Sequence, residues 1–246
     1  MEFTIEESDD DGQDFPPRVI EKLDRGLVAV NRGEDVFLSW RMLGPDPQNI
    51  GFNIYRNDTK INDAPITDRT NYVDSTGNAE AGYHIVPVVN GSEKSASETV
   101  NVWDNQYLEI ALDQPPKGPQ GGTYTPNDMS VGDLDGDMEY ELVIKWYPSN
   151  AKDNAHSGYT DASRLEAIAM DGTSLWRIDL GKNIRSGAHY TQFMVYDLDS
   201  DGKAEIACKT APGTKDGTGE YLSTGPTSDD NDEADYRRSD GKIQFD

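Results

Sequence analysis

Positive charge is scarce in this chain. Of its 246 residues, 22 are lysine or arginine and 46 are aspartate or glutamate, so the formal net charge is −24 at pH 7. This surplus excludes nucleic acid and anionic membranes as bulk electrostatic partners, although a local basic cluster or bound cations can still hold an anionic substrate. A protein that works in high salt can carry such an acidic surface, because salt screens the repulsion between its carboxylates. We therefore expect no nucleic-acid partner, no membrane partner and a halophilic source.

Cysteine and long apolar runs are also scarce. Cys208 is the single cysteine, so no disulfide can form within the chain, and we expect it to pack as a small hydrophobic side chain. No apolar run approaches the length of a membrane-spanning helix. The N-terminus lacks the basic and apolar segments of a secretory signal. Residues 1–17 are predicted to form a disordered acidic tail.

A sustained helical period is missing as well. Short runs of alternating apolar and polar residues take its place, which is typical of half-buried strands. We predict an all-β fold that begins with a small antiparallel sandwich over residues 18–103. This sandwich resembles a fibronectin type III domain, with Trp40 and Tyr83 in its core. The alternating runs are VFLSW (36–40), GFNIYRN (51–57), YHIVPVV (83–89) and SASETVNVW (95–103).

A repeat follows the Pro- and Gly-rich boundary DQPPKGPQGG (113–122). YTPNDMSVGDLDGDMEYELVIKWYP aligns with HYTQFMVYDLDSDGKAEIACKTAP, and the segment 165–180 between them predicts a hairpin that turns at Asp171-Gly172. Such repeats are typical of propeller blades, so residues 104–246 are predicted to form the first blades of a β-propeller. Two copies do not close a propeller, and the polar end of the chain indicates a fragment of a longer protein.

Each copy of the repeat carries a dense acidic loop. DLDGDMEYE (133–141) and DLDSDGKAE (197–205) both place carboxylates at positions 1, 3, 5 and 9, and Gly136 and Gly202 relieve the turn at different positions. Crowded carboxylates repel one another, and Ca²⁺ accepts six to eight oxygen ligands in loose geometry. A solvated acidic turn is the alternative, but two equivalent loops argue against it. The predicted Ca²⁺ ligands are Asp133, Asp135, Asp137, Glu141, Asp197, Asp199, Asp201 and Glu205, the main-chain carbonyls of Glu139 and Lys203, and Asp128 as an additional ligand.

Basic and aromatic residues surround the same loops. Lys145 and Lys209 occupy equivalent positions in the two copies. Lysines repeated in an acidic chain can face a central channel and attract a polyanion, or each can pair with a carboxylate of a neighbouring blade. A single histidine such as His189 is more often structural than catalytic. The candidate catalytic residues are Lys145, His189, Tyr190 and Lys209.

Longer motifs go beyond a generic propeller. GKNIRSGAHYTQFMVYDLDSDGKAE (181–205) and VGDLDGDMEYELVIKWYPSNAKDN (131–154) resemble the rhamnogalacturonan lyases of polysaccharide lyase family 11. The resemblance implies an N-terminal β-domain, an eight-bladed calcium-loaded propeller, and extracellular cleavage of the rhamnogalacturonan I backbone of pectin. It also implies that Asn127 contacts the sugar. Tyr147 stands in KWYPSN where the family pattern is closer to KWDPSN, and is expected near the substrate.

The implied reaction is β-elimination at galacturonate. It needs a neutralised carboxylate, a base for the C5 proton and assistance to the departing O4. The resemblance divides the sugar groove between early and late blades, so the C-terminal part of the propeller is an expected partner. Three hypotheses follow: a lyase completed by further sequence or a second polypeptide, a non-catalytic calcium- and polysaccharide-binding remnant, and a calcium scaffold of the integrin-propeller type. The family motifs argue against the third.

Overall fold

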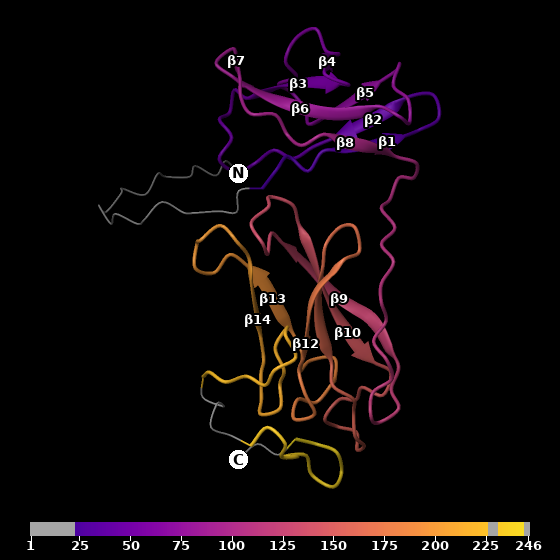
Figure 1. The fold of residues 1–246 in the computed structure, drawn as a ribbon, viewed down its shortest axis with the longest axis vertical. Coiled ribbons are helices and arrows are strands. Elements are labelled where there is room, and N and C mark those ends of the chain that lie inside the picture. The colour runs from indigo at the N-terminus through magenta and orange to yellow at the C-terminus, as the bar shows by residue number, and fades with distance from the viewer. Residues whose placement is uncertain (1–22, 226–230, 244–246) are drawn as a thin grey trace, which may run out of the picture.

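A computed structural model describes residues 23–225 and 231–243 of the chain. Every regular element in these residues is a strand (Figure 1), so the all-β prediction is confirmed for the described part. Within the same ranges no helix is long and apolar enough to span a bilayer. The predicted acidic tail, residues 1–17, lies outside the described residues.

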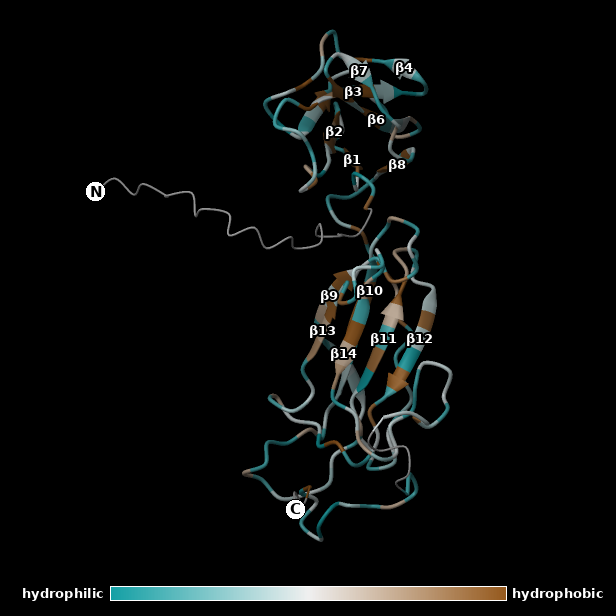
Figure 2. Ribbon diagram, turned by 90° about the vertical axis from the view of Figure 1, so that its left-hand side faces the viewer, coloured by the Kyte–Doolittle hydropathy of each residue, from teal (hydrophilic) through white to brown (hydrophobic). Residues whose placement is uncertain are grey.

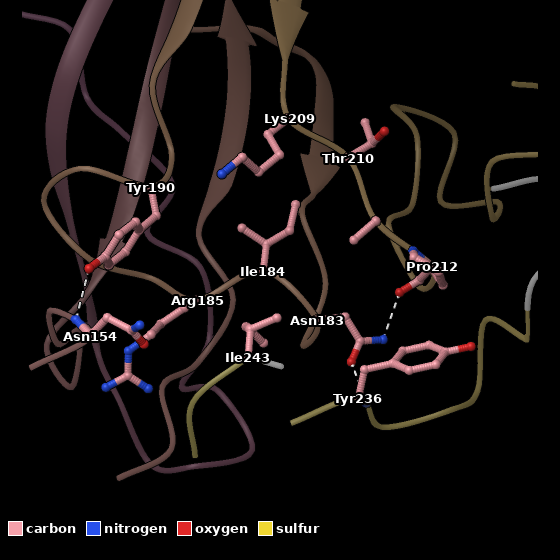
Figure 3. A pocket seen from close by; sticks show the side chains of 11 residues that line it. Asn154, Asn183, Ile184, Arg185, Tyr190, Lys209, Thr210, Pro212, Tyr236 and Ile243 are labelled. Atoms are coloured by element: carbon pink, nitrogen blue, oxygen red, sulfur yellow. Dashed lines mark hydrogen bonds between the residues drawn. The ribbon is translucent and has the colours of Figure 1, made fainter. Parts of the chain in front are cut away.

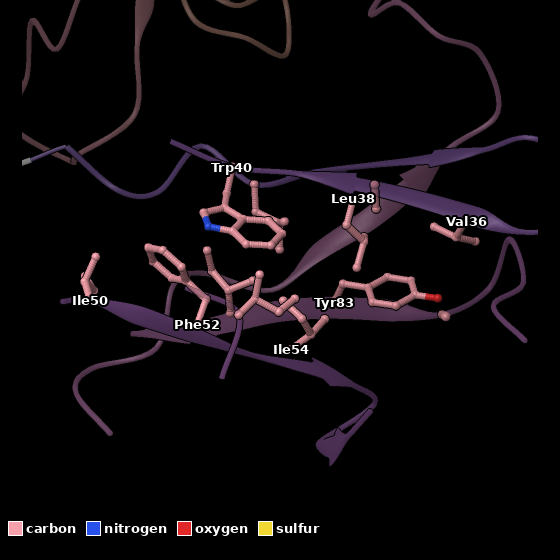
Figure 4. Packing of buried hydrophobic residues seen from close by; sticks show 12 residues of the cluster. Val36, Leu38, Trp40, Ile50, Phe52, Ile54 and Tyr83 are labelled. Atoms are coloured by element: carbon pink, nitrogen blue, oxygen red, sulfur yellow. The ribbon is translucent and has the colours of Figure 1, made fainter. Parts of the chain in front are cut away.

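Residues 23–103, here called the first body, form one sheet that folds over on itself. The strand order is β4-β3-β6-β8-β1-β2-β5, with β7 paired to β6. The two halves of the sheet face each other across a shared apolar core (Figure 4). The strands are β1 (Val28–Asn31), β2 (Val36–Ser39), β3 (Gly51–Arg56), β4 (Thr59–Lys60), β5 (Asn71–Asp74), β6 (Gly82–Val89), β7 (Ser92–Glu93) and β8 (Val100–Trp103).

Both aromatic residues predicted for this core are buried in it. The rings of Trp40 and Phe52 meet edge to face with centroids 5.4 Å apart, which is a favourable aromatic geometry. Tyr83 packs in the same cluster and donates its hydroxyl to Asp74 Oδ2 at 2.8 Å. A buried phenol needs such a partner, so the Tyr83 ring can remain in the core without an unpaired hydroxyl.

Two details of the predicted sandwich were wrong. The sheet is not fully antiparallel, because β8 pairs antiparallel with β6 on one side and therefore runs parallel to β1 on the other. The run over 95–103 is also a strand only from Val100. Ser97 interrupts it, since its N–H donates to the Ile85 carbonyl while its hydroxyl accepts the Ile85 N–H. A side chain that replaces a ladder acceptor ends regular pairing.

The second body, residues 104–225 and 231–243, contains two smaller sheets (Figure 1). The first is antiparallel in the order β12-β11-β10-β9, and β13 pairs with β14. The predicted hairpin at Asp171-Gly172 is confirmed, with Gly172 at φ 91°. The strands are β9 (Tyr124–Gly132), β10 (Glu141–Pro148), β11 (Arg164–Ile168), β12 (Ser174–Asp179), β13 (Phe193–Tyr196) and β14 (Glu205–Cys208).

Apolar packing in the second body is divided between two small clusters. In one, Val143 and Ala167 of the four-stranded sheet pack against Val195 beside β14. In the other, Leu165 and neighbouring residues pack against the half-buried Cys208, whose thiol pKa is raised by burial. Hydrophobic and hydrophilic segments alternate along these strands (Figure 2). Polar contacts therefore share the stabilisation of this body.

Candidate functional site

The two acidic loops join β9 to β10 and β13 to β14. In the first, carboxylate oxygens of Asp133, Asp135 and Glu141 all lie within 4.8 Å of one another. In the second, the equivalent oxygens belong to Asp197, Asp199 and Glu205. In each loop the carboxylates at positions 1, 3 and 9 thus converge on one point, as the repeat predicts.

The same hydrogen bonds shape both loops. The Leu134 N–H donates to Glu141 Oε2 at 2.6 Å, and the equivalent Leu198 N–H donates to Glu205 Oε2 at 2.8 Å. The N–H groups at positions 5 and 7 donate to the carboxylate two residues earlier in each loop, at 2.8 to 3.1 Å. This shared network fixes the closing glutamate against the start of each loop.

The backbone explains why the glycines differ between the loops. Position 4 has positive φ in both, at 84° for Gly136 and 66° for Ser200. Position 6 does too, at 81° for Met138 and 96° for Gly202. Each loop thus places glycine at one left-handed position and another residue at the second, at a cost of about 1–2 kcal/mol. Strain of this kind persists where the surroundings require the conformation.

The donor set fits Ca²⁺. Asp197 is 7% exposed, and its Oδ1 has no hydrogen-bond partner within the described residues. Burial raises the pKa of Glu141; the Leu134 N–H opposes this rise, and the nearby aspartates add to it. A buried anionic oxygen without a partner is unfavourable, and a bound cation would remove that penalty.

The side chains at positions 5 and 7 lie outside the convergent groups, and at position 7 only the main-chain carbonyl is a predicted ligand. The carboxylates of Asp137 and Asp201 accept the N–H of position 7 and stand outside the convergent groups. The Glu139 side chain is exposed. Lys203 Nζ donates to the Asp135 carbonyl at 2.6 Å, so its side chain crosses from the second loop to the first. The two loops are thereby tied to each other.

Lys145 forms an ion pair rather than a free cationic site. The side chain is 2% exposed, and its Nζ contacts Asp128 Oδ2 on the adjacent strand β9. The pairing alternative therefore holds for Lys145, although the carboxylate comes from the same sheet and not from a neighbouring blade. Asp128, predicted as an additional metal ligand, is occupied by this ion pair instead.

A β-bulge presents the predicted sugar-contacting residue. Opposite Lys145 of β10, strand β9 has two residues, Asn127 and Asp128. Pro126, which has no N–H to donate to the ladder, precedes them. Bulges re-aim side chains beside functional sites. Asn127 is exposed at this point, next to the ion pair of the buried Lys145 with the exposed Asp128.

An open hollow of about 560 Å³ is lined by Tyr147, Lys152, Asp153 and His156. The Lys145 ammonium lies 5.8 Å from the centre of the Tyr147 ring. Burial, followed by Asp153 and Asp128, raises the pKa of the Tyr147 phenol. His189 is 76% exposed, with Nδ1 at 3.8 Å from Asp153 Oδ1. A hollow lined by an aromatic ring and by lysine and histidine side chains is suited to an acidic sugar.

Tyr190 and Lys209 line a separate pocket of about 350 Å³ (Figure 3). The Tyr190 hydroxyl accepts the Asn154 N–H at 2.8 Å, which connects this pocket to the chain segment that lines the hollow. The structure therefore brings together only part of the predicted set. Tyr147 belongs to the hollow, Tyr190 and Lys209 belong to the pocket, and Lys145 lies in its ion pair.

Arg185 lines the pocket and binds the chain segment that forms the hollow. It is 5% exposed and donates only to main-chain carbonyls. Nothing in the sequence distinguishes it from a surface arginine, because its acceptors come from two segments far apart in the chain. These acceptors are the carbonyls of Lys152, Asp153, His156, Gly158 and Gly241.

Comparison with known families agrees with this arrangement of strands and loops. Residues 107–245 match the model of "Rhamnogalacturonan lyase family 11, C-terminal domain". The chain belongs to this family. Its first part, residues 18–103, matches the model of "Rhamnogalacturonan I lyases beta-sheet domain". The family expected from the sequence motifs is therefore confirmed.

Two curated relatives come from Bacillus subtilis (strain 168). The chain is 53% identical over 231 residues to the rhamnogalacturonan endolyase YesW, with 92% of this chain and 36% of the relative aligned. It is 50% identical over 230 residues to the rhamnogalacturonan exolyase YesX, again with 92% and 36% aligned. The chain thus spans about a third of the length of these relatives.

Solved structures of family members superpose closely on the fold. The exotype rhamnogalacturonan lyase YesX has a TM-score of 0.86 at 49% identity, with 93% of this chain and 37% of that chain covered. The Bacillus licheniformis rhamnogalacturonan lyase PL11 has a TM-score of 0.85 at 52% identity, with 93% and 38% covered.

Proposed function

We propose that this chain is the N-terminal part of a calcium-dependent lyase that cleaves the rhamnogalacturonan I backbone of pectin. Membership of rhamnogalacturonan lyase family 11 over residues 107–245 carries the proposal. Identities to the endolyase and the exolyase are 53% and 50%. Because these values are so similar, this part of the protein gives no preference for internal or terminal cleavage.

The proposal includes a finer description of the fold. Residues 18–103 are a fibronectin III-like sandwich, and residues 104–246 are the first blades of an eight-bladed calcium-binding propeller. Support comes from the two-layered core of the first body and from the identical hydrogen bonds of the two acidic loops. The exposed edge of β9 suits a strand that lines a central channel.

The reaction is β-elimination at galacturonate. A base removes the C5 proton, a double bond forms between C4 and C5, and the sugar attached through O4 leaves and gains a proton. In this proposal Lys152 and His156, which line the hollow, hold the uronate carboxylate, and the exposed Asn127 of the β9 bulge hydrogen-bonds the sugar. Lys145, fixed by Asp128, is better suited to neutralise charge than to accept a proton. Tyr190, Lys209 and His189 remain the candidates for proton transfer.

Calcium, when bound, would neutralise the acidic loops and so fix the strands that carry these residues. The ligands would be the convergent carboxylates of each loop. We further propose extracellular action on the polymer, the C-terminal part of the propeller as partner, and a halophilic source, which the net charge of −24 supports.

A non-catalytic calcium- and polysaccharide-binding role is the second candidate. The observation in its favour is that Lys145 and Arg185, two basic residues near the hollow, are both occupied by contacts within the protein. In this alternative the hollow would bind rhamnogalacturonan without cleaving it.

The test is absorbance of the unsaturated uronate product. The chain, alone and mixed with the C-terminal part of the propeller, is incubated with rhamnogalacturonan I in calcium or in chelator, beside the variants Lys209→Ala and Lys94→Ala, the latter an exposed control in the first body. Calcium-dependent absorbance that Lys209→Ala lowers and Lys94→Ala leaves unchanged supports the lyase. Binding by calorimetry without absorbance supports the remnant, and neither signal from a folded chain contradicts both.

A further inference from the structure

The first acidic loop is also a contact surface between the two bodies. The Asp24 N–H donates to the Met138 carbonyl at 2.9 Å. The Arg41 guanidinium lies over the Tyr140 ring at 4.5 Å from its centre. Met138 and Tyr140 are positions 6 and 8 of the loop. In Figure 1 this loop lies at the end of the second body that faces the first.

The second acidic loop makes no such contact within the described residues. Its hydrogen bonds join it to itself and, through the Lys203 ammonium and the Ala204 N–H, to the first loop. The two loops therefore share one backbone conformation and one set of ligands, but only the first touches the first body in the part of the chain described. This difference makes the second loop a matched control for the first.

Docking brings like charges together. Glu139 lies near the carboxylates of Asp137, Glu98 and Asp24 and near the guanidinium of Arg41. Asp24 and Glu98 belong to the first body, so docking adds their charge to an already acidic loop. Because the carboxylates named here outnumber the one guanidinium, a cation bound in the loop would lessen the repulsion between them.

We infer that a cation in the first acidic loop latches the two bodies of the chain together, and that a cation in the second loop does not. The inference rests on the proposed calcium binding. Tyr140 lies between position 7, whose carbonyl is a predicted ligand, and Glu141, which closes the cage. A bound cation would fix both neighbours of Tyr140, hold its ring under Arg41, and offset the repulsion from Asp24 and Glu98.

The test compares Asp135→Asn with Asp199→Asn, which remove the same ligand from the first and second loop. Single-molecule energy transfer measures docking between Asp63→Cys and Ser223→Cys, one label on each body, with Cys208 replaced by Ala. Chelation of the parent chain should lower the equilibrium constant for docking of the two bodies by about 5- to 150-fold, the usual range for coupled sites. Asp199→Asn should retain the shift and Asp135→Asn should lose it. Equal behaviour of the two variants would overturn the inference.

A second pair of variants isolates the contact itself. Tyr140→Phe keeps the ring under Arg41 and should dock normally in calcium, whereas Tyr140→Ala should undock although near-ultraviolet circular dichroism shows it folded. Terbium luminescence in the Asp199→Asn background reports metal at the first loop. Metal binding without any effect on docking refutes the latch alone. Absence of metal binding refutes the proposed calcium role together with it.

Discussion

The two bodies of this chain are stabilised in different ways. The first has a continuous apolar core in which Leu38, Ile54 and Ile85 are fully buried. The second divides its apolar residues between small clusters and buries charged groups such as Asp161, Glu166 and Arg185. Apolar burial needs no ligand, whereas crowded carboxylates do. The comparison teaches that apolar burial dominates the packing of the first body, whereas the second combines small apolar clusters with buried charged groups.

Removal of calcium should have the largest effect and should separate the stabilities of the two bodies. A chelator should lower the unfolding temperature of the second body and leave that of the first unchanged. At free calcium one hundred times the dissociation constant, each loop should contribute about 2.7 kcal/mol. Differential scanning calorimetry resolves the two transitions, and an equal fall in both would contradict the prediction.

A cavity in the first body should destabilise that body and leave the second unchanged. Phe52→Ala removes a ring packed against Trp40 and should lower the free energy of unfolding by about 3–5 kcal/mol. Only the transition of the first body should move. Phe37→Ala on β2 serves as a control, since the Phe37 ring is only half-buried, beside Arg32. Movement of the second transition would show that the bodies unfold as one unit.

Replacement of a buried carboxylate should destabilise the second body. Asp161 is 2% exposed and accepts the N–H groups of Gln120 and Gly122 at 2.8 and 2.7 Å. Asp161→Asn should cost about 1.5–3 kcal/mol, because an amide replaces one acceptor of charged hydrogen bonds. Asp171→Asn, in an exposed turn, is the matched control. Chemical denaturation followed by tryptophan fluorescence measures both.

The two acidic loops can be compared by adding one methyl group to each. At Gly202 a Cβ meets nothing within 4 Å, so Gly202→Ala should cost only the left-handed conformation, about 1–2 kcal/mol. At Gly136 the Cβ would lie 2.9 Å from the Lys203 side chain, so Gly136→Ala should cost more. Thermal unfolding in calcium measures the difference. Equal costs would indicate that the contact of the Lys203 side chain with the first loop does not contribute to stability.

The smallest expected effect is a pH dependence in the second body. The hydrogen bond from Arg237 lowers the pKa of Asp235 to about 2 from the ordinary 3.8. A depressed carboxyl pKa stabilises the fold above the ordinary value, and that stability is lost as pH falls from about 4 towards 2. Asp235 is 45% exposed, so solvent weakens the effect. Arg237→Met should flatten this part of a stability-against-pH curve.

The local features of this protein could be predicted from the sequence. Alternation identified β2, β3 and β6, and Asp171-Gly172 identified the hairpin of β11 and β12. The acidic repeat identified the convergent carboxylates. Each signal lies within a few consecutive residues, because strand period, turn conformation and loop ligands are short-range properties.

Longer-range relations were decided only by the tertiary structure. The parallel pairing of β8 with β1, the ion pair of Lys145 with Asp128 and the carbonyl partners of Arg185 depend on which segments meet. The contact of Arg41 with Tyr140 depends in addition on how the two bodies dock. The composition and spacing of a sequence specify what a side chain can bind, but packing of distant segments determines which partner lies within reach.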